Sequence, residues 1–184
     1  MMVKVCGITR RQDAEAAVAA GASAIGFIFY PQSPRYVTPE TAAELGNGLD
    51  VWKVGVFVDE SPASIEAMMR AAHLDVAQVY GGELPSVPRV WRALRPDSPA
   101  RPGETVEAIL LDGPANGMTF DWSKARGVSE KLILAGGLNA SNVAEAIRIV
   151  QPWGVDASSG LESAPGIKDH DKVRQFVKAA QEAS

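Results

Sequence analysis

Short apolar segments rich in β-branched residues alternate along this 184-residue chain with segments of helical periodicity. Several of the short segments are apolar nearly throughout, as expected of parallel strands that are covered on both faces. This alternation restricts the chain to folds built from repeated strand–helix units. The predicted strands are residues 3–6, 24–29, 54–58, 75–79, 90–94, 108–111, 131–134 and 155–157.

Strands that alternate with helices form either a closed (β/α)8 barrel or an open, doubly wound sheet. Helix starts are well marked, because Thr38-Pro39 and Ser61-Pro62 each place a capping residue before a proline at the first helical position. We favour the barrel rather than the open sheet. The prediction is therefore a single α/β domain, a compact TIM barrel, that comprises residues 1–184. Its fourth and fifth β/α units are predicted to be short, because the segment 95–104 is proline-rich and is interpreted as a loop.

Charge and composition exclude several classes of partner. The formal net charge is −4 and no basic stripe is present, which argues against nucleic acid as a partner. No uninterrupted apolar segment is long enough to span a membrane, and no secretory signal is recognisable, so we expect a cytoplasmic protein. One cysteine and two histidines argue against a disulfide framework and a histidine-rich metal site.

In a barrel of this kind the active site lies at the carboxyl ends of the strands. The predicted seventh and eighth strands are followed by Gly136-Gly137 and Ser158-Ser159-Gly160. Glycine lets the backbone approach a ligand closely, and these two loops hold phosphate in many barrels. The alternative is that the glycines form a tight turn and the serines cap a helix. Both groups together favour a phosphate site.

Three further residues at strand ends carry chemistry, and each has a structural alternative. Cys6 ends the first strand, where it is either a reactive thiol or a small buried apolar residue. Arg35, beside Pro34, either binds a carboxylate or lies on the surface. Asp121 precedes Trp122; it is either a general acid, its pKa raised by an apolar pocket, or a helix N-cap, and the two roles can coexist.

The order of these motifs resembles that of the phosphoribosylanthranilate isomerase family. The resemblance covers almost the whole chain. It rests on the residues 4–10, 26–31, 33–37, 54–58, 119–122, 134–138, 154–160 and 162–169, which include Lys4-Val5-Cys6-Gly7-Ile8-Thr9-Arg10 and Thr119-Phe120-Asp121-Trp122.

The resemblance implies a (β/α)8 enzyme of tryptophan biosynthesis that catalyses a cofactor-independent Amadori rearrangement of N-(5′-phosphoribosyl)anthranilate. Asp121 would be the general acid and Cys6 the general base. Arg35 would bind the anthranilate carboxylate. The phosphate would be surrounded by Gly136, Gly137, Ser158, Ser159 and Gly160, and Asp156 would line the site. The expected partner is this phosphorylated small molecule, and the protein is expected to be a monomer or a homodimer.

Two departures from the family's pattern leave alternatives open. Many members have a histidine where this chain has Tyr80, so Tyr80 is a candidate substrate contact of different chemistry. The loop after the sixth predicted strand is also short, over residues 113–118. An isomerase with altered specificity for phosphoribosyl substrates therefore remains an alternative, and so does a phosphate-binding barrel without catalysis.

Overall fold

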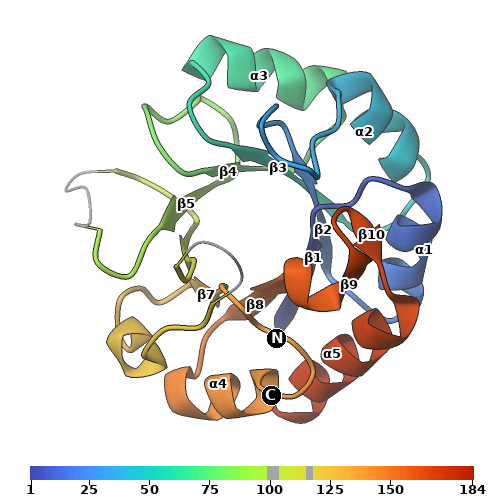
Figure 1. Cartoon of the computed structure of the whole chain (residues 1–184). Helices are drawn as coiled ribbons and strands as arrows, with labels where there is room; N and C mark the ends of the chain where they lie inside the picture. Colours follow the sequence, from blue (N-terminus) through green and yellow to red (C-terminus); the bar gives the residue numbers. More distant parts are fainter. Residues whose placement is uncertain (99–103, 115–117) are drawn as a thin grey trace.

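The computed structural model describes residues 1–98, 104–114 and 118–184. Eight parallel strands close into a barrel in the order β1 to β8, with β8 paired to β1 (Figure 1). This closure confirms the barrel and excludes the open sheet. The strands are β1 Met2–Cys6, β2 Ala24–Ile28, β3 Trp52–Phe57, β4 Val76–Val79, β5 Val90–Leu94, β6 Ala108–Leu111, β7 Leu132–Leu134 and β8 Gly154–Ala157.

Each predicted strand is confirmed, with its ends no more than two residues from the predicted ones. The predicted helix caps are confirmed as well: the side chains of Thr38 and Ser61 accept hydrogen bonds from Thr41 N and Ser64 N. The helices are α1 Arg11–Ala19, α2 Pro39–Gly46, α3 Pro62–Ala71, α4 Val143–Val150 and α5 His170–Glu182, with the 3-10 turns η1 Trp122–Ala125 and η2 Ser159–Leu161. A hairpin of β9 Glu162–Ala164 and β10 Ile167–Lys168 precedes α5.

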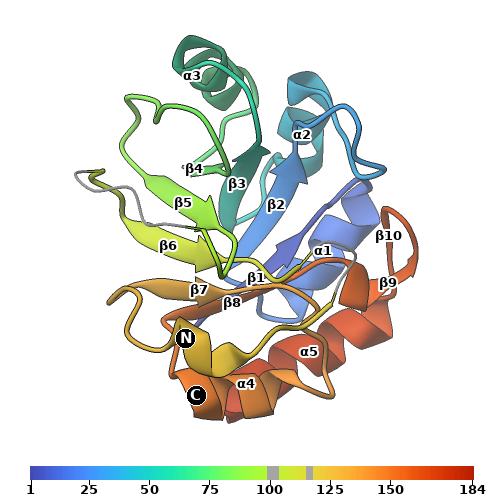
Figure 2. The same ribbon diagram turned by 60° about the vertical axis from the view of Figure 1, so that its left-hand side comes forward.

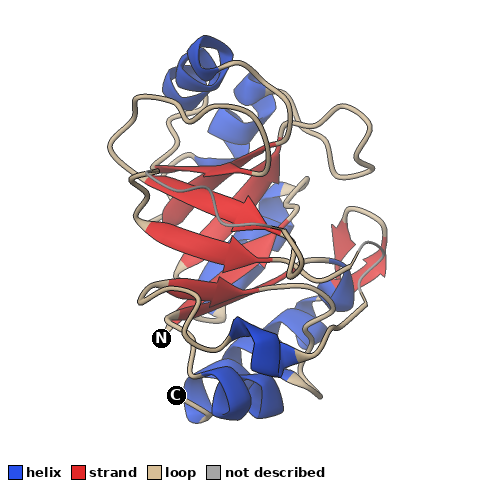
Figure 3. Cartoon of the chain, turned by 90° about the vertical axis from the view of Figure 1, so that its left-hand side faces the viewer, coloured by secondary structure: helices blue, strands red, loops and turns tan. Residues whose placement is uncertain are grey.

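The helices cover only part of the barrel. In Figures 1 and 2, α1, α2 and α3 lie against one side of the strands and α4 and α5 against another. The described residues between β4 and β5, and between β5 and β6, contain no helix. Figure 3 shows this sector, with strands facing the viewer and no helix of the described residues in front of them. The fourth and fifth units are thus reduced to strand and loop in the described part, although residues 99–103 lie outside it.

A buried arginine takes part in covering this sector. Arg92 of β5 is 1% exposed. Its Nε donates to Glu104 at 2.8 Å, and its two terminal nitrogens donate to the carbonyls of Gly81 and Gly82. Alternate residues of a strand face opposite ways, and the neighbours Trp91 and Ala93 belong to the barrel interior, so Arg92 points outward. It ties both short loops to the strand at a place where other units have a helix.

Three tryptophans pack together inside the barrel. Trp52, Trp91 and Trp153 have ring centroids 6.2–6.4 Å apart. Trp52 and Trp153 lie at or next to the starts of β3 and β8, so the cluster fills the end of the barrel opposite the carboxyl ends. Arg89 lies 3.6 Å over the Trp52 ring and forms a double hydrogen bond with Glu107. This aromatic packing fills one end of the barrel interior, whereas the carboxyl ends of the strands border the cavity described below.

Candidate active site

A cavity of about 290 Å³ opens at the carboxyl ends of the barrel strands. Every predicted site residue except Asp121 lines it, so the fold brings together residues that are up to 154 positions apart in the chain. The lining consists of Cys6, Ile28, Arg35, Val56, Gln78, Tyr80, Arg95, Asp112, Pro114, Ala135, Gly136, Gly137, Leu138, Asp156, Ala157, Ser158, Ser159 and Gly160.

Cys6 is the last residue of β1 and is 6% exposed. It pairs in register with Gly26 of β2. A Cβ atom added to Gly26 would lie 2.7 Å from Cys6 Sγ and 3.1 Å from Lys4 Cε. The missing side chain at Gly26 therefore provides the space in which the thiol and the lysine chain lie side by side. Cys6 is buried, as a small apolar core residue would be, and it is also part of the cavity wall, where a reactive thiol would have to lie.

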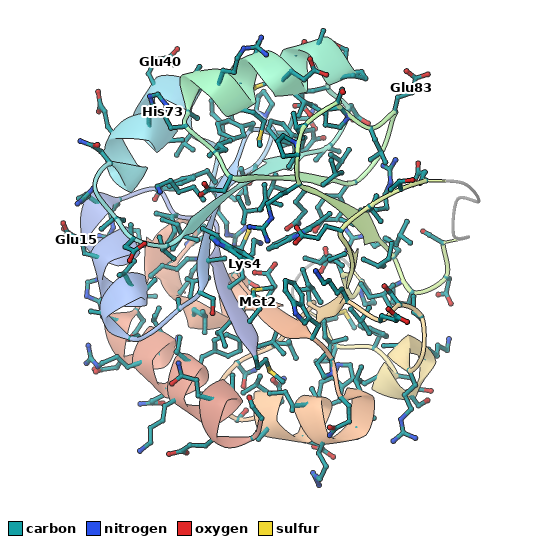
Figure 4. All side chains as sticks on the ribbon, turned by 180° about the vertical axis from the view of Figure 1, so that it is seen from behind. Met2, Lys4, Glu15, Glu40, His73 and Glu83 are labelled. Atoms are coloured by element: carbon teal, nitrogen blue, oxygen red, sulfur yellow. The ribbon has the colours of Figure 1, made fainter. Side chains whose placement is uncertain are left out.

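Lys4 is fully buried in the barrel, two residues before Cys6 and on the same face of β1. Figure 4 shows Lys4 and Met2 within the ring of strands, while Glu15, Glu40 and Glu83 lie on the periphery. Burial disfavours the charge of Lys4, but the Asp156 carboxylate 2.9 Å away and Cys6 outweigh burial and raise the pKa of the ammonium group. A buried ion pair therefore lies in the barrel interior next to the thiol.

The pKa of Cys6 is raised above its ordinary value because the thiol is buried, and the Asp156 carboxylate acts in the same direction. Lys4 opposes both effects, and Lys168 opposes them more weakly. The thiol is thus the favoured form at neutral pH. A thiol with a raised pKa gives, once its proton is lost, a more basic thiolate, and this suits the removal of a proton from carbon.

The predicted phosphate loops have the backbone that an anion site needs. Gly136 and Gly137 both have positive φ, and a Cβ added at Gly136 would lie 2.1 Å from Gly113 N. Their backbone N–H groups donate to no described residue, so they remain available to a ligand at the edge of the cavity. The neighbouring loop after β8 contributes Ser158, Ser159 and Gly160 to the same cavity. Both loops therefore border the same cavity, where their backbone could receive an anion.

Arg35 is not a solvated surface residue, since its side chain is only 19% exposed. Its Nε and Nη2 donate to the two oxygens of Glu162, each at 2.7 Å. Glu162 also accepts from Lys168 Nζ at 2.8 Å. Burial acts to raise the pKa of Glu162, but the hydrogen bonds from Arg35 and Lys168 outweigh it and lower that pKa. The guanidinium is thereby held in place with its Nη1 free of described protein acceptors.

A second polar group lies on the opposite wall. Tyr80 Oη donates to Asp112 Oδ2 at 3.0 Å, and Arg95 Nη1 donates to the same oxygen at 2.9 Å. Burial raises the pKa of Asp112, against the opposing effects of Arg95 and Tyr80. Burial and the nearby Asp112 raise the pKa of Tyr80 well above its ordinary value, so the phenol keeps its proton. Tyr80 is therefore a cavity residue that positions a carboxyl group.

Asp121 is the one predicted site residue that the structure places elsewhere. It is exposed, and it is the N-cap of η1, where its carboxylate accepts from Ser123 N and Ser123 Oγ. The hydrogen bonds from Ser123 lower its pKa. The expected raised pKa beside an apolar pocket is thus wrong for this structure, because the carboxylate faces solvent and is stabilised by capping. The N-cap interpretation is confirmed.

Sequence reasoning did not single out Lys4, Gln78, Asp112 or Glu162 as site residues. A signal for Lys4 exists, because a lysine two positions before Cys6 in an apolar strand shares its face. Asp112 directly follows β6, as active-site residues do in barrels. Over residues 1–98, 104–114 and 118–184, no group of three His, Cys, Asp or Glu residues is arranged to hold a metal ion.

Comparison with known proteins gives the same picture. A family model described as N-(5′-phosphoribosyl)anthranilate (PRA) isomerase matches residues 3–179. N-(5′-phosphoribosyl)anthranilate isomerase of Solibacter usitatus is 50% identical over 203 residues, covering 100% of this chain and 98% of the relative. The crystal structure of phosphoribosyl anthranilate isomerase from Thermus thermophilus matches with a TM-score of 0.91 and 36% identity over 100% of both chains.

One related structure contains a ligand. A phosphoribosyl anthranilate isomerase in complex with reduced 1-(o-carboxyphenylamino)-1-deoxyribulose 5-phosphate matches with a TM-score of 0.83 and 36% identity over 99% of both chains. That protein thus binds a phosphorylated small molecule. Because the family model spans nearly the whole chain and a half-identical relative aligns along all of it, this chain belongs to the N-(5′-phosphoribosyl)anthranilate isomerase family.

Proposed function

We propose that Cys6 is the general base and Asp121 the general acid of this isomerase, and that Arg35 and the two glycine-containing loops hold the ends of the substrate. The isomerase role in tryptophan biosynthesis follows from the family. The observation that carries the roles of Cys6, Arg35 and the two loops is one cavity that joins a buried thiol, an arginine and a backbone anion site, whereas Asp121 lies outside it. The substrate is N-(5′-phosphoribosyl)anthranilate and the product 1-(2-carboxyphenylamino)-1-deoxyribulose 5-phosphate.

The first step needs an acid. Protonation of the ribose ring oxygen breaks its bond to C1, and the anthranilate nitrogen supplies the electron pair that forms the C1=N iminium. Asp121 takes this role through its match to the family motif Thr119-Phe120-Asp121-Trp122. Asp112 lines the cavity and has a raised pKa, so it is the residue with which Asp121 is compared as a candidate general acid.

The second step needs a base. The iminium withdraws electrons from C2, so that the C2–H bond becomes acidic and no cofactor is needed. The Cys6 thiolate removes this proton and the C1=C2 enolamine forms. Protonation of C1 and loss of the proton from the C2 hydroxyl then give the ketone. Lys4 favours the thiolate because a buried ammonium group lies beside it. No covalent bond to sulfur forms in this sequence.

The two ends of the substrate carry negative charge and meet different partners. The N–H groups of Gly136 and Gly137, with Ser158, Ser159 and Gly160, take the phosphate. Arg35 takes the anthranilate carboxylate with the edge of its guanidinium that Glu162 leaves free. Asp156 lines the space between these ends. Holding both ends places C2 over the thiol, so that proton transfer is effectively intramolecular.

The decisive experiment follows anthranilate fluorescence while the purified protein acts on freshly generated substrate. Cys6→Ser and Asp121→Asn are each expected to lower kcat by about 10²- to 10⁴-fold, the usual contribution of a general acid or base, with the fold intact by circular dichroism. Asp112→Asn is the matched comparison for the acid. A near-normal rate for Asp121→Asn together with a large loss for Asp112→Asn would move the acid role to Asp112.

The same assay tests the alternatives. Turnover of another phosphoribosyl substrate in preference to this one would identify an isomerase of altered specificity. Phosphate binding without any turnover would identify a non-catalytic barrel. We further propose that residues 1–184 act as one domain, in the cytoplasm, as a monomer or a homodimer. The described residues contain no helix that is long and apolar enough to cross a membrane.

A further inference from the structure

Two buried oxygen atoms of residues that line the cavity lack a hydrogen-bond partner among the described residues. They are Oε1 of Gln78 and Oδ1 of Asp156. Gln78 is 1% exposed and Asp156 is 6% exposed, and both line the cavity. Buried polar atoms in folded proteins are nearly always hydrogen-bonded, so two unpaired acceptors in one cavity point to donors that a ligand brings.

The two acceptors come from different sides of the barrel. Gln78 lies in β4, and Asp156 lies in β8, next to β1. The carboxylate of Asp156 is held by Lys4, whose Nζ donates to the other oxygen, Oδ2, at 2.9 Å. The carboxylate therefore cannot turn away to satisfy Oδ1 without breaking a buried ion pair. A ligand in the cavity would therefore be bordered by Gln78 on the β4 side and by Asp156 on the β8 side.

The charge of these acceptors decides which part of a ligand they meet. A phosphate or a carboxylate offers only acceptor oxygens at neutral pH and is repelled by Asp156. A hydroxyl group is the neutral donor that suits both a carboxamide oxygen and a carboxylate oxygen. Under the proposed function, the two anionic ends of the substrate are bound elsewhere, and the ribose hydroxyls lie between them.

We propose that Gln78 is a specificity-determining residue whose Oε1 accepts a hydrogen bond from one ribose hydroxyl, while Asp156 Oδ1 accepts one from the neighbouring hydroxyl. This inference rests on the proposed function and extends it to the sugar. The two hydrogen bonds fix how the ribose is rotated about the line that joins the phosphate and the carboxylate of the substrate. C2–H is thereby directed toward Cys6, which lies on the strand next to Asp156.

The consequence is discrimination against sugars that lack a hydroxyl. A site built around a substrate hydroxyl rejects the deoxy analogue strongly, because the buried acceptor is then left unpaired. A site that merely encloses the sugar shows no such preference. We therefore expect the protein to prefer ribose to deoxyribose, and we expect this preference to depend on the side-chain amide of Gln78.

The test measures how binding depends on the ligand hydroxyl and on Gln78 together. Ribose 5-phosphate, 2-deoxyribose 5-phosphate, 3-deoxyribose 5-phosphate and inorganic phosphate are titrated by NMR into the wild-type protein, Gln78→Met and Gln78→Glu. The wild type is expected to bind ribose 5-phosphate about tenfold or more tightly than one of the deoxy sugars, as for one buried hydrogen bond. In Gln78→Met this ratio falls toward one, while the affinity for inorganic phosphate is unchanged.

Two variants keep the test interpretable. Gln78→Glu retains an acceptor at the same place and is expected to keep the preference, so it still reports if Gln78→Met does not fold. Gln175→Leu, on the exposed face of α5, is the matched surface control and should leave every affinity unchanged. Equal ratios in the wild type and Gln78→Met would overturn the proposal, because Gln78 Oε1 would then bond no ligand hydroxyl.

The outcome is separable from that of the proposed function. Hydroxyl discrimination without turnover of N-(5′-phosphoribosyl)anthranilate would count against the proposed function only. Normal turnover with unchanged KM and unchanged ratios in Gln78→Met would count against the role of Gln78 only.

Discussion

Nζ of Lys4 lies 2.9 Å from Oδ2 of Asp156, across the pairing of β1 with β8 and in the interior of the barrel. Both side chains are almost completely buried, with 0% and 8% of their surface exposed. Removing one partner of such a pair leaves an uncompensated charge in a medium of low polarity. This pair therefore couples the stability of the barrel to the electrostatics of Cys6.

Lys4→Met is expected to destabilise the protein by about 3–5 kcal/mol, because Asp156 is left buried and unpaired. Urea denaturation followed by circular dichroism measures the change. The double variant Lys4→Met/Asp156→Leu is expected to recover much of the loss, since it removes both charges. A double variant no more stable than Lys4→Met would contradict this account of the pair.

The thiol of Cys6 is expected to react slowly at neutral pH and faster as the pH rises. Burial raises its pKa, and only the thiolate is reactive, so alkylation by iodoacetamide should increase through a pKa above the ordinary value. The chain has one cysteine, so the reaction is specific. kcat/KM should rise with pH along the same limb. An alkylation rate that is already constant above about pH 6, as for strongly activated thiols, would contradict this. It would show that Lys4 lowers the pKa of Cys6 by more than burial raises it.

Gly26→Ala is expected to lower kcat more than it raises KM. The new Cβ would lie 2.7 Å from Cys6 Sγ, so the thiol has to move away from C2 of the substrate. Steady-state kinetics followed by anthranilate fluorescence measures kcat and KM separately. Gly46→Ala is a control, because there the nearest atoms belong to the flexible Lys53 side chain. An unchanged kcat in folded Gly26→Ala would show that the position of the thiol tolerates this shift.

Arg35→Ala is expected to raise KM about tenfold or more, with a smaller change in kcat, because a charge-assisted hydrogen bond to the substrate carboxylate is lost. Kinetics at varied substrate concentration measures both constants. Arg11→Ala removes an arginine from an exposed pair with Glu15 and serves as the control. An unchanged Michaelis constant would mean that Arg35 acts only as the partner of Glu162.

Arg92→Ala is expected to destabilise the protein by about 3 kcal/mol, because it removes a buried cation from Glu104 and from two loop carbonyls. Urea denaturation measures the loss. Arg70→Ala, on the exposed face of α3, should change stability by less than about 0.5 kcal/mol. Equal stability of the two variants would mean that the sector without helices does not depend on Arg92.

The sequence by itself determined the barrel and most of its site. Local patterns are sufficient for this, because buried parallel strands are apolar throughout and helix starts have their own capping residues. Since the active site of a barrel lies at the carboxyl ends of its strands, strand ends alone indicated Cys6, the glycines and the serines. These features depend on neighbours in the chain.

Only the tertiary structure decided which charges meet. Lys4 and Asp156 are 152 residues apart, and Arg35 and Glu162 are 127 apart, so no local pattern predicts either pair. The pKa of Asp121 differs from these cases: the adjacent tryptophan suggested that it would be raised, but the hydrogen bonds from the nearby Ser123 lower it. The burial of Gln78 Oε1 without a partner among the described residues is likewise visible only in the folded barrel. Burial and long-range contacts set the charge state of a group, and these exist only once the barrel has closed.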